Sequence, residues 1–271
     1  MYILNGKFVE KKTASIPLCD HGLLYGDGIY ETLRTVNGSI WLFADHMKRF
    51  RRSADATGLE IPYTNNQLKS LIEKLILKNR YQESRIRITL TRGCNDFDFA
   101  SCKNPTLIIE AKKLKTPKKN LYKKGATAIT YKITRPAPHI KSTSMLPSIL
   151  AYRQAKNQNV FEALLVNEKE FITEASMSNF FAIKNQILYT PKENILHGTV
   201  RNYLIKLLKT RFEIKFLPIS HKELYDCDEL FITSTIKGVV PLVKVDNRNI
   251  SDGNVGFKTR EIMQIFANSL T

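Results

Sequence analysis

The stretch YETLRTVNGSIWLFADHMKRFRRSADATGL, residues 30–59, decides the fold class of the first half of the chain. Asn37 and Gly38 separate two strand-like runs, which is the strongest short signal for a β-hairpin. A helix-like run follows, with Asp45 as its predicted N-cap and Gly58 as its stop. A hairpin that leads directly into a helix, without alternating βαβ units, indicates an α+β arrangement.

The neighbouring segments extend this pattern. Residues 2–9 contain a second Asn-Gly hairpin, residues 65–80 place their leucines and isoleucines on one helical face, and residues 84–92 alternate strictly between apolar and polar side chains. A lysine-rich run then precedes many short strand-like segments and a few helices. We therefore predict an N-terminal α+β domain over residues 1–115, a basic linker over 116–124 and a strand-rich C-terminal domain over 125–271.

The bulk composition limits the classes of function. The chain has 271 residues, of which 43% are hydrophobic, so it is long and apolar enough for a sizeable core. Its net charge is +17, but the lysines are spread along the chain and no nucleic-acid-binding signature is present. We expect no nucleic-acid partner, and a basic nucleic-acid-binding protein on a degenerate enzyme fold is the remote alternative.

Targeting signals and cysteine usage indicate a compartment. The N-terminus lacks the pattern of a signal peptide and no apolar run approaches the length of a membrane span, so we expect a cytoplasmic protein without a membrane partner. The four cysteines, Cys19, Cys94, Cys102 and Cys227, show no metal-ligand spacing. We predict that all four are reduced thiols.

One lysine stands apart from the many that decorate the surface. In PHIKSTSMLP, residues 138–147, Lys141 lies where an apolar stretch ends and a Ser/Thr turn begins. A lysine that condenses with an aldehyde must be uncharged when it attacks, which favours a desolvated site or one near other positive charge. If the aldehyde is pyridoxal 5'-phosphate, the site also needs a carboxylate for the pyridine nitrogen and a cradle for the phosphate.

The chain offers each of these parts. Glu174 lies between two apolar segments, Gly198 and Thr199 open a predicted helix, Ser234 and Thr235 end a predicted strand, and Arg49 lies on the helix after FADH. Each feature alone is weak, because small polar residues occur at many strand–helix junctions. Together they match the requirements of the cofactor, so we predict pyridoxal 5'-phosphate and no metal.

Six motifs in order resemble the class IV aminotransferase family, the fold-type IV pyridoxal-phosphate enzymes. They are DHGLLYGDGIYETLR (20–34), HMKRFRRSA (46–54), RITLTRG (87–93), IKSTSMLPSILA (140–151), TEASMSNFF (173–181) and LHGTVR (196–201). The resemblance covers essentially the whole chain. It implies a two-domain fold similar to D-amino-acid aminotransferase, with a small N-terminal α/β sandwich domain and a larger strand-rich C-terminal domain, and it implies a homodimer.

The resemblance also implies a role for each matched residue. Lys141 forms the imine with the cofactor and moves protons at the substrate's α carbon, while Glu174 pairs with the pyridinium nitrogen. Tyr30 faces the substrate side, and Arg135 is the loosely spaced candidate for the cofactor's ring oxygen. The phosphate is held by Arg49, the backbone amides of Thr199 and Val200, Ser234 and Thr235. The family often has a threonine at position 200, so one hydroxyl contact is lost here.

The resemblance leaves the reaction open within the family. The segment after TRG lacks the Arg-x-His pair of D-amino-acid aminotransferases, and Leu146 stands where branched-chain aminotransferases have a tyrosine. We therefore predict a 4-amino-4-deoxychorismate lyase, which acts on a small anionic amino substrate and releases pyruvate and p-aminobenzoate in folate synthesis. The alternative is a class IV aminotransferase acting on branched-chain or D-amino acids.

Overall fold

The structure is a computed structural model that describes residues 1–270, and it divides into two compact units. The first unit contains residues 1–115 together with residues 140–144, and the second contains residues 116–139 and the chain from Met145 onward. The segment around Lys141 therefore belongs to the first unit. The domain boundaries predicted from sequence had placed this segment in the C-terminal domain. That prediction differs from the structure because spacing along the chain does not reveal that a segment pairs with a distant strand.

The first unit is built on a six-stranded sheet in which every neighbouring pair is antiparallel, in the order β2-β1-β6-β5-β3-β4. Asn5 and Gly6 join the first pair and Asn37 and Gly38 join β3 to β4, all with positive φ, so both predicted hairpins are confirmed. The strands are β1 (Tyr2–Leu4), β2 (Lys7–Val9), β3 (Gly28–Val36), β4 (Ser39–Ile40), β5 (Ser84–Thr91) and β6 (Thr106–Lys113).

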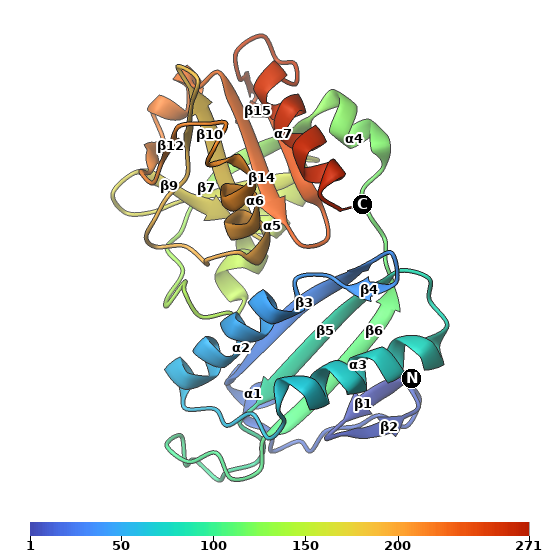
Figure 1. The fold of residues 1–271 in the computed structure, drawn as a ribbon. Coiled ribbons are helices and arrows are strands. Elements are labelled where there is room, and N and C mark those ends of the chain that lie inside the picture. Colours follow the sequence, from blue (N-terminus) through green and yellow to red (C-terminus); the bar gives the residue numbers. More distant parts are fainter. Residues whose placement is uncertain (271) are drawn as a thin grey trace. The chain divides into compact units, whose positions relative to one another are not determined.

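Three helices accompany this sheet: α1 (His21–Leu24), α2 (Phe43–Thr57) and α3 (Asn65–Asn79). Helix α2 ends at Gly58, as predicted, but Asp45 lies in its first turn and is not the N-cap. Figure 1 shows α2 and α3 along one face of the sheet. The apolar residues of β5 belong to the same core cluster as those of the two helices. The alternation of β5 thus marks its buried side. The core contains Met47, Phe50, Leu68, Ile72, Leu75, Ile86, Ile88 and Leu90.

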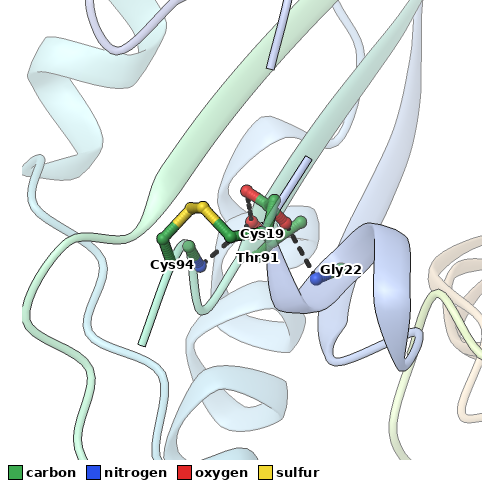
Figure 2. Close-up of a disulfide and its surroundings, with 6 residues drawn as sticks. Cys19, Gly22, Thr91 and Cys94 are labelled. Carbon is green, nitrogen blue, oxygen red and sulfur yellow. Dashed lines mark hydrogen bonds between the residues drawn. A yellow bond between two sulfur atoms is a disulfide. The ribbon is translucent and has the colours of Figure 1, made fainter. Parts of the chain in front are cut away.

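A disulfide joins Cys19 and Cys94, which lie 75 residues apart in the sequence, with a Cα–Cα distance of 5.1 Å (Figure 2). The prediction that all four cysteines are reduced thiols is therefore wrong for this pair, whereas Cys102 and Cys227 are free. Beside the bridge, Asp20 accepts hydrogen bonds from the Gly22 amide at 2.8 Å and the Thr91 hydroxyl at 2.9 Å. Sequence spacing could not show this pairing, because only the fold brings the two loops together.

The second unit is built on a ten-stranded mixed sheet in the order β12-β11-β10-β14-β15-β7-β8-β9-β13, with β16 paired to β15. Strands β7 and β8 pair in parallel, as do β15 with β7 and β11 with β12. The strands are β7 (Ala126–Lys132), β8 (Glu162–Val166), β9 (Phe171–Ala175), β10 (Asn179–Lys184), β11 (Ile187–Tyr189), β12 (Ile214–Lys215), β13 (Ile219–Ser220), β14 (Glu229–Ser234), β15 (Gly238–Val245) and β16 (Arg248–Asn249).

The helices of this unit are α4 (Lys119–Lys124), α5 (Leu146–Asn157), α6 (Thr199–Leu208) and α7 (Phe257–Asn268), with a 3-10 turn η1 (Glu223–Asp226). Helix α5 packs on β7 and β8, and α6 and α7 pack on β14 (Figure 1). The segment 116–124, predicted as a linker, instead contains α4 and is part of the second unit. Its Leu121 and Tyr122 pack against the core, a contact that the surrounding lysines conceal in the sequence. Within residues 1–270, no helix combines the length and the apolar character of a membrane span.

Candidate active site

Lys141 is held beside β3 by backbone pairing in the first unit. Its carbonyl accepts a hydrogen bond from the Tyr30 amide at 2.9 Å, and the Thr143 amide donates to the Gly28 carbonyl at 2.8 Å. The Lys141 amide donates to the Ser53 hydroxyl of α2 at 3.3 Å. These hydrogen bonds fix the backbone of Lys141. Because the residue is only half-buried, its side chain retains access to a ligand.

Two cations lie against the ring of Tyr30, which is 9% exposed. Lys141 Nζ is 4.5 Å from the ring centroid and Arg87 Cζ of β5 is 3.8 Å from it, both within the range of a cation–π contact. The sequence suggested that a reactive lysine needs positive charge or desolvation nearby, and Arg87 supplies such a charge. Sequence analysis treated Arg87 only as the polar side of an alternating strand.

Arg49, the predicted phosphate ligand of the first unit, is fixed by a buried carboxylate. Its Nε donates to Glu31 Oε1 at 2.6 Å and its Nη2 donates to Glu31 Oε2 at 2.7 Å. Burial raises the pKa of Glu31, but the charge and hydrogen bonds of Arg49, with those of His46, outweigh it and hold this pKa well below its ordinary value. The bidentate pair therefore sets the plane of the Arg49 guanidinium.

His46 completes this cluster from α2, where it is fully buried. Its Nδ1 is 2.8 Å from Glu31 Oε2. Burial lowers the pKa of His46, and although Glu31 opposes this shift, the charges of Arg49 and Lys141 add to it. His46 is therefore neutral at pH 7 and donates its Nδ1–H to the carboxylate.

A cavity of about 350 Å³ opens on the sheet of the first unit and has Arg87 in its wall. Most of its remaining lining is apolar, and includes Tyr2, Leu4, Ile16 and Ile108. A guanidinium binds a carboxylate through paired N–H groups, and apolar walls favour an apolar side chain. The cavity thus has the chemistry to hold an amino acid that carries a hydrocarbon side chain.

Glu174 is the central carboxylate of the second unit and is 3% exposed. Its Oε2 accepts hydrogen bonds from the Leu196 amide at 3.2 Å and from Asn179 Nδ2 at 3.3 Å. Its Oε1 pairs with the guanidinium of Arg135. One oxygen is thus fixed by neutral donors while the other meets a cation, which is the arrangement that a protonated pyridine nitrogen requires.

The N-terminus of α6 is tied to the same carboxylate. Asn179 Nδ2 also donates to the Leu196 carbonyl at 2.7 Å, and a Cβ placed on the N-cap Gly198 would come within 2.0 Å of Asn179 Oδ1. Glycine is therefore required at this position. Thr199 and Val200 form the first turn of the helix, where backbone amides and the helix dipole favour an anion.

The structure divides the predicted site residues between the two units. Tyr30, Arg49 and Lys141 lie together in the first unit, whereas the second holds Arg135, Glu174, Thr199, Val200, Ser234 and Thr235. Ser234 and Thr235 lie in the half-buried turn from β14 to β15. The cation that already faces Glu174 and the amides of the first turn of α6 fit a protonated ring and a phosphate. Sequence analysis missed Glu31, His46, Arg87 and Asn179, since buried partners leave no local signal.

Comparisons with known proteins agree on one family. The model of the family described as "Amino-transferase class IV" matches residues 28–245. A Methanocaldococcus jannaschii protein, named provisionally as a branched-chain-amino-acid aminotransferase, is 36% identical over 99% of this chain and 96% of its own length. A D-alanine aminotransferase of Staphylococcus epidermidis is 33% identical over 97% of this chain and 95% of its own length.

Solved structures share the fold. A branched-chain amino acid aminotransferase of the organism abbreviated T.th., solved with pyridoxamine 5'-phosphate, superposes with a TM-score of 0.94 at 25% identity, covering 100% of this chain and 93% of its own. A Legionella pneumophila protein, named provisionally as a 4-amino-4-deoxychorismate lyase, superposes with a TM-score of 0.87 at 24% identity, covering 96% of this chain and 97% of its own. The second likeness shows the fold alone.

Proposed function

The chain belongs to the class IV aminotransferase family, and from this premise we propose that it is an aminotransferase whose preferred substrates are branched-chain amino acids. The observation that carries the proposal is that the Lys141 amine and the Arg87 guanidinium both contact the Tyr30 ring, while Arg87 also lines a mostly apolar cavity. An amine, a carboxylate-binding group and apolar walls on one face are what such a substrate needs.

The cofactor is pyridoxal 5'-phosphate, whose amino form is bound in the solved branched-chain aminotransferase that shares this fold. When bound, this cofactor supplies an aldehyde that takes up amines and a ring that withdraws electrons from the substrate's α carbon. Lys141 would be the amine that binds it covalently and would then move the proton at the α carbon. Arg49, held in plane by Glu31, would bind the phosphate from the first unit.

The second unit contains the candidate ligands of the ring and further candidate ligands of the phosphate. Glu174 would accept the N–H of the ring nitrogen, and Arg135, which pairs with its Oε1, is the candidate for the ring oxygen. The amides of Thr199 and Val200 and the hydroxyls of Ser234 and Thr235 would donate to the phosphate. Arg87 would bind the substrate carboxylate, and Tyr30, which both cations contact, would line the substrate side.

The lyase, which sequence analysis preferred, is now the weaker proposal. The two relatives described above, at 36% and 33% identity, are named as aminotransferases, and the lyase match, at 24% identity, carries no argument about activity. Sequence analysis also relied on the absence of a carboxylate-binding residue, and Arg87 has the chemistry of such a residue. Between the two aminotransferase substrates, the apolar cavity and the missing Arg-x-His pair favour branched-chain over D-amino acids.

The test compares the half-reactions of competing substrates. Each half-reaction is monitored through the loss of the cofactor's visible absorption band. We expect L-leucine, L-isoleucine and L-valine to react faster than D-alanine, and aminodeoxychorismate to release no pyruvate. Lys141→Ala should lower turnover on every substrate by about 10³-fold or more, whereas Lys132→Ala, at an exposed ion pair, should not. Faster pyruvate release than any amino-acid half-reaction would restore the lyase.

We also propose that the protein is a cytoplasmic homodimer. The disulfide-linked loops of the first unit expose large apolar side chains, which monomeric proteins rarely gather in one patch; they are Leu18, Leu23, Leu24, Tyr25, Phe97 and Phe99. A second copy of the chain would cover them. Sizing chromatography of the wild type should give twice the monomer mass, and Phe97→Asp should lower the measured mass. A monomeric wild type would overturn the dimer. Cell fractionation tests the proposed compartment.

A further inference from the structure

Glu162 and Lys237 form an ion pair inside the second unit that the proposed chemistry does not use. Lys237 Nζ is 2.8 Å from Glu162 Oε2, with the glutamate fully buried and the lysine side chain 20% exposed. Glu162 Oε1 accepts hydrogen bonds from the Ser176 hydroxyl and from the Ala163 amide. Burying two charges costs free energy that their attraction only roughly offsets, so the pair is weak evidence for stability. Its role must be sought in what it positions.

Lys237 fixes the turn that carries two predicted phosphate ligands. Its backbone amide donates to the Ser234 hydroxyl at 3.4 Å, and its carbonyl accepts from the Tyr122 hydroxyl of α4 at 2.7 Å. Thr235 lies inside this turn, which ends at Gly238 with a φ of +65°. The side chain, the amide and the carbonyl of one residue therefore anchor the turn at three points.

Glu162 fixes the turn that follows the predicted ring partner. Ser176 lies two residues after Glu174, and its amide donates to the Ala163 carbonyl at 2.9 Å while its hydroxyl donates to Glu162. Lys237 Nζ also reaches Ser178 Oγ of the same turn at 3.5 Å. The ion pair thus joins the turn of residues 174–179 to the turn of residues 234–237.

We propose that Glu162 and Lys237 are positioning residues that hold the ring partner Glu174 and the phosphate ligands Ser234 and Thr235 at the spacing of one bound cofactor. This inference rests on the proposed function, because it assumes that both turns contact pyridoxal phosphate. Loss of the pair should weaken cofactor binding and move the phosphate without removing a chemical group. Loss of an orienting partner costs about 10–100-fold in affinity at metal sites, and we expect a similar loss here.

The decisive variant is the double substitution Glu162→Gln with Lys237→Met, because neither single charge is then left buried and unpaired. We expect its cofactor dissociation constant to rise about tenfold or more, its bound-phosphate 31P resonance to shift, and the melting temperature of the cofactor-free protein to stay near that of wild type. The single variant Lys237→Arg keeps a cation beside Glu162, so it should retain most of the wild-type cofactor affinity. The half-buried pair Lys258 and Glu261 of α7 is the matched control, and its double substitution should change none of the three readouts.

Cofactor affinity within twofold of wild type and an unshifted phosphate resonance in the double variant would overturn the proposal. If that variant does not fold, Tyr122→Phe decides, since it removes the hydroxyl that donates to the Lys237 carbonyl. A shifted resonance there supports the role, and an unshifted one overturns it. Failure of the proposed function is a separate outcome, because it would appear in the wild type as absent turnover of branched-chain amino acids, while the cofactor affinities of wild type and variant could still be compared.

Discussion

Each unit buries a carboxylate at the heart of its part of the site, but the two carboxylates are satisfied differently. In the first unit, Glu31 is met on both oxygens by Arg49 and on one also by His46. In the second, Glu174 has one oxygen fixed by Asn179 and the Leu196 amide, and the other paired with Arg135, whose side chain is 19% exposed. The charge of Glu31 is compensated within the core, whereas that of Glu174 is compensated by a group that reaches the surface.

This difference separates support from chemistry. A carboxylate whose hydrogen-bond partners are all buried holds those partners in place, and a ligand cannot readily displace them. A carboxylate with one fixed oxygen and one exposed cationic partner can exchange that partner for the nitrogen of a ligand. The comparison predicts that changes at Glu31 act first on stability and changes at Glu174 act first on turnover.

The largest effect is expected for Glu31→Gln. It leaves Arg49 without a buried counter-charge, and breaking a buried pair from one side costs about 3–5 kcal/mol. Urea unfolding of the cofactor-free protein measures this loss. Glu110→Gln is the control, because Glu110 pairs with Arg85 and Lys112 at the surface and should cost less than about 1 kcal/mol. Equal losses in the two variants would show that the Glu31 cluster is not a structural support.

Glu174→Gln should act in the opposite sense. A neutral partner no longer stabilises the protonated ring, so turnover should fall about 10²–10³-fold, the usual loss for one preorganised electrostatic group. The amide can keep the contacts of Oε2, so the free energy of unfolding should change by less than about 1 kcal/mol. Glu170→Gln, at an exposed pair with Lys132, is the control. A variant that turns over like wild type would remove Glu174 from the chemistry.

The disulfide adds a second form of support to the first unit. Cys19→Ser should lower the free energy of unfolding by about 2–4 kcal/mol, because a bridge across 75 residues restricts the unfolded chain. A reductant should lower wild-type stability by a similar amount, and Cys102→Ser, which changes a free thiol, should not. If reductant leaves the stability of the wild type unchanged, the two thiols are unbridged in solution.

Much of the fold could be read from sequence because its signals are local. The Asn-Gly hairpins, the alternation of β5 and the glycine at the end of α2 each follow from backbone preferences of a few residues. Contacts between distant segments could not be read. The pairing of Lys141 with β3, the bridge from Cys19 to Cys94 and the packing of α4 depend on where the chain returns, which no short pattern encodes.

The candidate site shows the same limit. Residues with a recognisable motif, such as Lys141 and Glu174, could be named from sequence together with an expected role. Their supports could not, because Glu31 and Asn179 look like ordinary polar residues until the fold buries them against Arg49 and Gly198. Arg87 was misread for a related reason. Its polar position in an alternating strand indicates exposure, while its contact with Tyr30 depends on the neighbouring strand.

The smallest expected effect is a dependence of first-unit stability on pH. The pKa of His46 is lowered in the fold, so below its ordinary value of about 6.5 the unfolded chain takes up a proton that the folded chain does not. Stability should therefore fall between pH 7 and pH 5, by at most about 2 kcal/mol. The pKa of Glu31 is also lowered, so its contribution is lost further into acid, below the ordinary carboxyl pKa.

Urea unfolding from pH 8 to pH 2 should show these two losses in succession, and two variants assign them. His46→Gln should flatten only the first, and Glu31→Gln should remove the second. A wild type of constant stability from pH 7 to pH 5 would mean that His46 is charged inside the fold. The Glu31 cluster would then contain two positive charges, on Arg49 and His46, against the single negative charge of Glu31. The charge of Glu31 would therefore be exceeded by the charges of its partners.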